Sequence, residues 1–172
     1  MGTSRSQFML LYLIRHGIAI DRSDPKSPPE GERPLTAKGM QKTRAAALGL
    51  AELGTKLDVF ISSPYVRAVQ TAEIFTEAFG FRPDKIRLTD ALKPTANPAE
   101  IVKEVQRIRA KEIACFGHAP HLDLAIAQLS GARAVFTELK KAGIACFEHS
   151  APHGRWTLRW LVSPKLLRDL AK

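Results

Sequence analysis

Apolar positions along the chain follow two different periods. Short apolar runs predict strands at residues 8–14, 57–61, 86–88 and 112–116. Between these runs, apolar residues recur every three or four positions, which predicts helices at residues 36–53, 64–79, 97–109 and 120–129. Because strand and helix alternate, we expect this part of the chain to build a parallel sheet that is covered by its connecting helices.

Three of the expected helices carry start signals. Thr36 is placed to cap the first helix, and Ser63 followed by Pro64 provides a cap and a first helical residue for the second. Asn97 and Glu100 have the spacing of a capping box in front of the third. These signals agree with the boundaries that the apolar period predicts.

The alternation ends in the last third of the chain. Residues 143–148 and 155–162 read as two consecutive strands, and residues 164–170 as a final helix. Consecutive strands are typical of an antiparallel hairpin. We therefore expect one α/β domain over residues 1–172, with three layers, a mostly parallel sheet, helices on both faces and an antiparallel strand near the C-terminus. Residues 1–7 are expected to be a flexible tail.

Length and composition agree with one compact domain. The chain has 172 residues, of which 45% are hydrophobic and 25% are charged, so it can bury a sizeable core and is neither disordered nor repetitive in composition. Its formal net charge is +9, without any run of five like charges. This balance favours anionic substrates or an acidic partner protein, and it gives no support to nucleic-acid binding.

The sequence predicts a cytoplasmic protein that does not bind membranes. The apolar run at residues 8–14 is too short to cross a bilayer, and charged residues follow it without a small-residue cleavage site. Cys115 and Cys146 lie in apolar stretches, which is typical of reduced, buried thiols.

One group of residues has a spacing similar to that of metal ligands. Cys146, His149 and His153 are separated by two and three residues. They extend across an expected strand end and a loop, however, and no fourth ligand completes the pattern. We therefore expect neither a metal nor a cofactor.

Cationic and imidazole side chains follow three of the expected strands. Arg15, His16 and Gly17 come directly after the first strand, Arg67 lies in the first turn of the helix after the second, and His118 follows the strand at residues 112–116. The carboxyl ends of parallel strands are where α/β sheets place their ligands, and the start of a helix attracts anions. A polar loop at residues 21–34, with Asp-Pro and Ser-Pro-Pro turns, predicts a flexible flap over this edge.

These residue types suit phosphoryl transfer. Two guanidinium groups match phosphoryl oxygens and spread negative charge, and a neutral imidazole nitrogen is a good nucleophile for phosphorus. Nearby arginines also favour the neutral imidazole by lowering its pKa. Because phosphoryl transfer depends mostly on positioning and charge stabilisation, such a pocket can work without metal.

Four motifs occur in a fixed order: RHG at residues 15–17, RPLTAKG at 33–39, SSPYVRAVQT at 62–71 and GH at 117–118. Together they resemble the histidine phosphatase superfamily, which has the phosphoglycerate mutase-like fold. The resemblance spans roughly residues 8–170. Within this superfamily, the chain is most similar to the SixA-type phosphohistidine phosphatases in its short length, its tight motif spacing and its C-terminal segment.

The resemblance implies a role for each motif residue. His16 is expected to be transiently phosphorylated, and Arg15 and Arg67 to hold the phosphoryl oxygens. His118 is expected to donate a further hydrogen bond to these oxygens, and the carbonyl of Gly17 to fix the tautomer of His16. The expected substrate is phosphohistidine on a signalling protein.

The chain departs from larger members of the superfamily in the segment that holds their acidic general acid. Residues 88–94 contain one carboxylate, Asp90, which is either a weak general acid or a turn residue. Since the imidazole of phosphohistidine leaves more easily than an alkoxide, a missing acid favours phosphohistidine. Two alternatives stay open: a phosphatase of small phosphoesters or nucleotides, and a non-catalytic phosphate-binding or protein-docking module.

Overall fold

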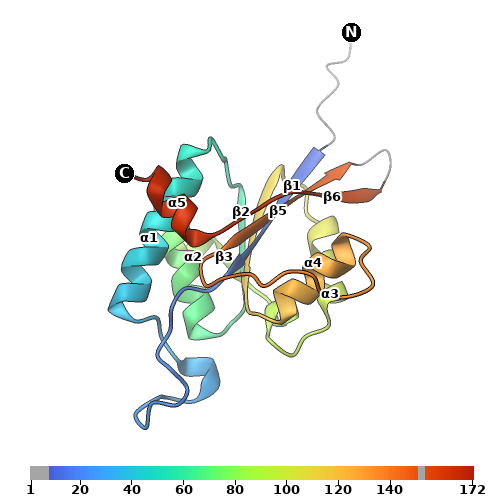
Figure 1. The fold of residues 1–172 in the computed structure, drawn as a ribbon. Coiled ribbons are helices and arrows are strands. Elements are labelled where there is room, and N and C mark those ends of the chain that lie inside the picture. Colours follow the sequence, from blue (N-terminus) through green and yellow to red (C-terminus); the bar gives the residue numbers. More distant parts are fainter. Residues whose placement is uncertain (1–7, 151–153) are drawn as a thin grey trace.

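The computed structural model describes residues 8–150 and 154–172. In these residues it contains one six-stranded sheet between two layers of helices (Figure 1). The strand order is β3-β2-β4-β1-β5-β6, and β5 is antiparallel to both of its neighbours. The strands are β1 (Phe8–Arg15), β2 (Val59–Ser62), β3 (Ile86–Leu88), β4 (Glu112–Gly117), β5 (Ile144–Ser150) and β6 (Arg155–Val162).

Helices α1, α2 and α5 cover one face of the sheet, and α3 and α4 cover the other (Figure 1). None of these helices is long and apolar enough to span a membrane. The helices are α1 (Ala37–Glu52), α2 (Val66–Ala78), α3 (Pro98–Gln106), α4 (His121–Leu129) and α5 (Pro164–Leu170). This arrangement confirms the predicted three-layer α/β fold. The expected tail at residues 1–7 lies outside the described residues.

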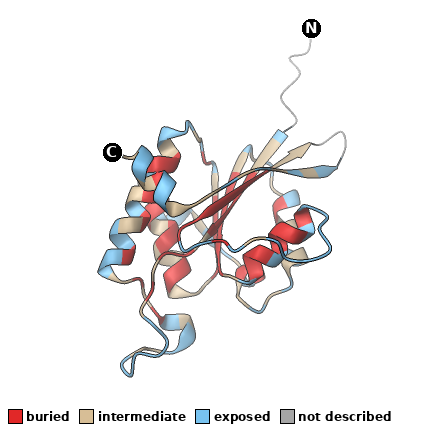
Figure 2. Cartoon of the chain, in the orientation of Figure 1, coloured by how far each residue is buried: buried red, intermediate tan, exposed pale blue. Residues whose placement is uncertain are grey.

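Successive side chains of β1 point to opposite faces of the sheet, and both faces are buried there. Tyr12 and Ile14 point into the apolar cluster under α1, α2 and α5, whereas Leu11 and Leu13 point into the cluster under α3 and α4. All four side chains are nearly inaccessible to solvent. Figure 2 shows the buried residues concentrated on the sheet and on the helix sides that face it.

The start of α2 differs from the prediction by two residues. The helix begins at Val66, not at Pro64, and its N-cap is Tyr65, whose side chain makes no capping bond. Ser63 still makes the bond expected of a cap, since its hydroxyl accepts the Tyr65 N–H at 3.3 Å, and it also lies 2.9 Å from Nε2 of His118. Arg67 nevertheless lies in the first turn, as expected.

Backbone hydrogen bonds join the carboxyl ends of three strands. The N–H of His16, after β1, donates to the Gly117 carbonyl of β4 at 2.9 Å. The N–H of Ser63, after β2, donates to the Phe116 carbonyl at 3.0 Å. The segments that carry the predicted site residues are therefore fixed to one another at one edge of the sheet.

The antiparallel direction of β5 brings its first residue, rather than its last, to this edge. Ile144 pairs with Ile14 near the end of β1, and the preceding turn contacts the RHG segment. In that turn, the N–H of Ala142 donates to the carbonyls of Arg15 at 3.0 Å and His16 at 3.2 Å. Ala142 has a φ of 61°, a left-handed conformation that is unusual for a residue with a Cβ.

The sequence motifs pack directly on one another. Gln70 accepts the N–H of Leu35 at 2.7 Å, and Thr71 accepts the N–H of Gly17 at 3.0 Å. Gly39, the glycine of RPLTAKG, lies against the Ile18 carbonyl so closely that a Cβ there would overlap it. The spacing of these motifs therefore reflects how α1 and α2 hold the segment after β1.

We expect Gly17→Ala to reduce the free energy of unfolding by about 1–3 kcal/mol, because the new Cβ would overlap Oγ1 of Thr43. That hydroxyl has no hydrogen-bond partner among the described residues. Thr43→Ala in the Gly17→Ala background should therefore recover part of the loss. Urea denaturation of the two single variants and the double variant measures the coupling between the sites, and strictly additive effects would contradict the proposed overlap.

Candidate active site

A polar pocket lies where β1, β2 and β4 end at one edge of the sheet. Its cavity has a volume of about 290 Å³ and is lined by Arg15, His16, Arg67 and His118 together with residues of the flap. The structure thus brings together the four side chains that the sequence analysis selected. Their catalytic roles stay predictions.

The tautomer of His16 follows from its hydrogen bonds. Nδ1 lies 2.7 Å from the Gly17 carbonyl, and because a carbonyl only accepts, Nδ1 carries the hydrogen. Nε2 therefore has a free lone pair, which accepts a hydrogen bond from Nε of Arg67 at 3.2 Å. The Gly17 carbonyl has the position that the resemblance implied.

His118 lies beside His16, and both residues are buried. The two ring centroids are 5.1 Å apart, and Nε2 of His118 is 2.9 Å from the hydroxyl of Ser63. The ring of Tyr65 packs edge-on against His118, with 5.2 Å between centroids. Ser63 and Tyr65 thus hold the second imidazole in place.

Both imidazoles are neutral at working pH. Burial is the main cause that lowers the pKa of His16 to about 3, and the charges of Arg67 and Arg15 act in the same direction. Burial, followed by the effects of His16 and Arg67, lowers the pKa of His118 to about 2. A neutral imidazole keeps the lone pair that nucleophilic attack requires.

All three side-chain nitrogen atoms of Arg67 donate hydrogen bonds. Its side chain is 3% exposed. Besides the bond from Nε to His16, Nη1 donates to the Glu30 carbonyl at 2.6 Å and Nη2 donates to Oε1 of Glu30 at 2.7 Å. The guanidinium carbon also lies 5.1 Å from the centroid of the Tyr65 ring. Arg67 therefore links the imidazole to the flap.

Arg15 reaches the pocket from the end of β1. Its Nη1 donates to the Leu139 carbonyl at 2.7 Å, and no described carboxylate forms an ion pair with it. The guanidinium thus keeps a positive charge at the pocket wall that no paired acid neutralises.

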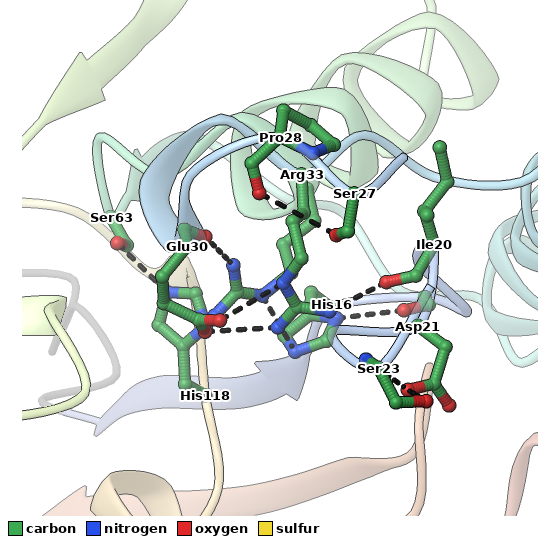
Figure 3. A network of polar contacts seen from close by, with 12 residues as sticks. His16, Ile20, Asp21, Ser23, Ser27, Pro28, Glu30, Arg33, Ser63 and His118 are labelled. Carbon is green, nitrogen blue, oxygen red and sulfur yellow. Dashed lines mark hydrogen bonds and ion pairs between the residues drawn. The ribbon is translucent and has the colours of Figure 1, made fainter. Parts of the chain in front are cut away.

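The flap contributes four pocket residues that the sequence analysis did not select: Asp21, Arg22, Glu30 and Arg33. Figure 3 shows Glu30 and Arg33 near His16 and His118, and the Glu30 carboxylate also accepts from Nη2 of Arg67 at 2.7 Å. Arg33 donates to it from Nε and Nη2, both at 2.9 Å, and its Nη1 donates to the Ile20 carbonyl at 2.6 Å. Glu30 and Arg33 are three residues apart, a spacing typical of local ion pairs, so the sequence could have indicated this pair. The sequence has no comparable signal for the contact of Glu30 with Arg67.

Asp90 does not reach the pocket. It begins a short 3-10 helix (Asp90–Leu92), its side chain is 78% exposed, and its carboxylate binds Nζ of Lys93 at 2.9 Å. The nearby Pro94 is the part of this segment that lines the cavity. This placement agrees with the turn-residue alternative for Asp90.

The metal-like pattern near the C-terminus does not assemble in the part that the structure describes. Cys146 and His149 point to opposite faces of β5, and His153 lies outside the described residues. Within residues 8–150 and 154–172, no three His, Cys, Asp or Glu side chains are grouped so that they could hold a metal ion.

The family profile of the histidine phosphatase superfamily (branch 1) matches residues 11–97, half of the chain. The chain belongs to this superfamily. The profile match confirms the family resemblance. An uncharacterized protein of Picosynechococcus is 36% identical over 168 residues, which cover 92% of this chain and 99% of that protein.

Solved structures of two phosphatases share the fold. The protein histidine phosphatase SixA, solved with tungstate, superposes with a TM-score of 0.79 at 23% identity, over 92% of this chain and 99% of that one. A phosphoserine phosphatase mutant from Entamoeba histolytica, solved with phosphoserine, has a TM-score of 0.73 at 18% identity, over 92% and 99% of the two chains. This histidine phosphatase therefore has the architecture of enzymes with different substrates.

We expect the free energy of unfolding to fall as the pH drops below about 6.5, the ordinary pKa of a solvent-exposed histidine. His16 and His118 stay neutral in the folded protein down to about pH 3 and about pH 2, whereas both take up protons in the unfolded chain near that ordinary value. Each histidine should remove roughly 1 kcal/mol of stability per pH unit in this range.

Urea denaturation at pH 7, 6 and 5 measures this slope, and His118→Asn should make it flatter. An unchanged slope in that variant would show that His118 is not held neutral in the folded state.

Proposed function

We propose that this histidine phosphatase hydrolyses its substrate through a phosphohistidine intermediate on Nε2 of His16. The observation that carries the proposal is the fixed tautomer of His16. It leaves Nε2 unprotonated, with its lone pair directed at Arg67 inside a cationic pocket. In the proposed reaction, Nε2 bonds to phosphorus as the bond to the leaving group breaks. Water then attacks phosphorus, releases phosphate and returns the lone pair to Nε2.

The neighbouring side chains supply positioning and charge. Arg15 and Arg67 are proposed to bind the phosphoryl oxygens, because their guanidinium groups line the same cavity as His16. For this, Nε of Arg67 must exchange its bond to His16 for a bond to the substrate. His118 is proposed to donate a hydrogen bond to a phosphoryl oxygen once its ring is released from Ser63. The proposal needs no metal or cofactor.

We propose phosphohistidine on a signalling protein as the substrate. The two carboxylates that line the pocket, Asp21 and Glu30, are both held below their ordinary pKa by hydrogen bonds, and so neither carries a proton to donate at neutral pH. An alkoxide leaves poorly without a proton donor, whereas the imidazole of phosphohistidine leaves as a neutral ring once it is protonated. The structural similarity to SixA supports the same substrate class.

A phosphatase of small phosphoesters is the second candidate. A cavity of about 290 Å³ accommodates a small phosphorylated molecule, and the fold is shared with a phosphoserine phosphatase. The buried, neutral His16 favours catalysis over the third alternative, a module that only binds phosphate. A cytoplasmic location belongs to the proposal as well, and the free, buried thiols of Cys115 and Cys146 agree with it.

Labelled substrate should leave phosphate on the enzyme at His16. The label is expected to be acid-labile and alkali-stable, as phosphoramidates are, and to form in the presence of a metal chelator. His16→Ala should form no labelled protein, whereas His118→Ala should label more slowly at the same residue. Rapid quenching with alkaline detergent, followed by peptide mapping at alkaline pH, identifies the site because the label survives there. Label on any residue other than His16 would exclude the proposed nucleophile.

A substrate panel tests the leaving-group argument. Phosphohistidine protein and activated aryl phosphates should be hydrolysed at least about 100-fold faster than phosphoserine or sugar phosphates, because only the latter need a strong proton donor. Asp90→Asn should change the phosphohistidine rate by less than about twofold, since its side chain is 78% exposed and binds Lys93. Fast hydrolysis of an alkyl phosphate that is lost in Asp90→Asn would support the small-phosphoester alternative.

A further inference from the structure

The pocket contains more cations than its neighbouring acids neutralise. Five positively charged residues and two acids, Asp21 and Glu30, line it. The five are Arg15, Arg22, Arg33, Arg67 and Lys141. Asp21 is turned away to the backbone N–H and the hydroxyl of Ser23, at 2.9 Å and 2.7 Å. Glu30 is thus the acid whose carboxylate contacts the cations of the pocket.

Glu30 presents two oxygens to one guanidinium group. Its backbone carbonyl accepts from Nη1 of Arg67 and its carboxylate accepts from Nη2, while the same carboxylate accepts two bonds from Arg33. A phosphoryl group bound by Arg67 would present oxygens to the same nitrogen atoms. The two ligands cannot both use these donors fully.

The burial of the partners decides which of them can move. The side chain of Glu30 is 44% exposed, whereas that of Arg67 is 3% exposed and its charge is anchored among buried groups. The Glu30 carboxylate can therefore turn into solvent, where water hydrates its charge. The buried Arg67 guanidinium cannot follow it.

We propose that Glu30 is an internal competitor of the substrate: its carboxylate occupies the phosphoryl-binding donors of Arg67 in the empty pocket, and an incoming phosphoryl group displaces it and loosens the flap. This inference rests on the proposed function, because it assumes that the pocket binds phosphoryl groups. It adds that the flap lowers the affinity of the pocket for anions.

The same contact connects the flap to the proposed nucleophile. Arg67 binds Glu30 and also donates to the lone pair of His16, so the empty pocket keeps that lone pair engaged. When a phosphoryl group takes the place of Glu30, the guanidinium can turn toward the phosphoryl oxygens and free Nε2. The carboxylate of Glu30 thereby restrains a nucleophile that is already in the reactive tautomer.

A proton-donor role for Glu30 does not agree with its surroundings. Hydrogen bonds from Arg33, with the charge of Arg67 adding to them, hold the pKa of the Glu30 carboxyl below its ordinary value despite partial burial. An ionised carboxylate competes with an anionic substrate but has no proton to give to its leaving group.

Anion binding to the Glu30→Gln variant provides the test. Glutamine keeps the size of the side chain and removes its charge, and so the dissociation constants of tungstate and inorganic phosphate, measured by titration calorimetry, should fall about threefold to tenfold. Glu32→Gln is the matched control: Glu32 belongs to the same short 3-10 helix (Glu30–Glu32), is exposed and has no described ion pair. It should change the constants by less than about twofold.

Kinetics distinguish competition from simple positioning. In Glu30→Gln, KM should fall by the same factor as the dissociation constants while kcat stays within about twofold, because only the competing carboxylate has been removed. Unchanged or weaker tungstate binding, or a lower kcat with an unchanged KM, would show that Glu30 holds the arginines in place, and the inference would be wrong.

Hydrogen exchange of the wild-type protein gives a second readout that needs no variant. The N–H of Glu32 donates to the Pro29 carbonyl at 2.8 Å, and its exchange should accelerate when tungstate binds. Slower or unchanged exchange would contradict displacement of the flap. If the wild type binds neither tungstate nor phosphate, the proposed function fails and this inference fails with it. If the anions bind equally well to wild type and Glu30→Gln, only this inference fails.

Discussion

A guanidinium group that is almost completely buried must have its donors satisfied, and in Arg67 this requirement organises the pocket around one side chain. The helix that carries Arg67 begins at the end of β2, so the group lies at the edge where β1 and β4 also end. Its nitrogen atoms bind a strand-end imidazole and a flap residue. Strand, helix and flap are thereby connected through one charged group.

Much of the fold could be predicted because its determinants are local. The apolar period located the six strands and five α-helices of the described residues but not the short 3-10 helices, and Thr36 caps α1 through its side chain, as expected from its residue type. The predicted start of α2 was wrong by two residues, because an apolar period and a capping residue do not define a helix end more closely than that. The contact of Ser63 with His118, which is 55 residues away, has no signal in the local sequence.

The candidate site also has a part that the sequence predicts and a part that it does not. The sequence predicts that four side chains lie together, because the carboxyl ends of parallel strands share one edge: Arg15, His16, Arg67 and His118. Glu30 and Arg33 lie in an irregular loop, where no period specifies which way a side chain points. Their contacts with the pocket depend on how the whole flap folds back over it, and this is a tertiary property.

The reversed direction of β5 also determines which parts of the molecule can change without touching the pocket. Because β5 starts at the pocket edge, its last residue, Ser150, lies at the opposite end of the sheet, paired with Phe8 of β1 and Arg155 of β6 (Figure 1). The length of β1 and β5 separates this end of the sheet from the reacting groups, so substitutions there can accumulate without a change in the geometry of the pocket.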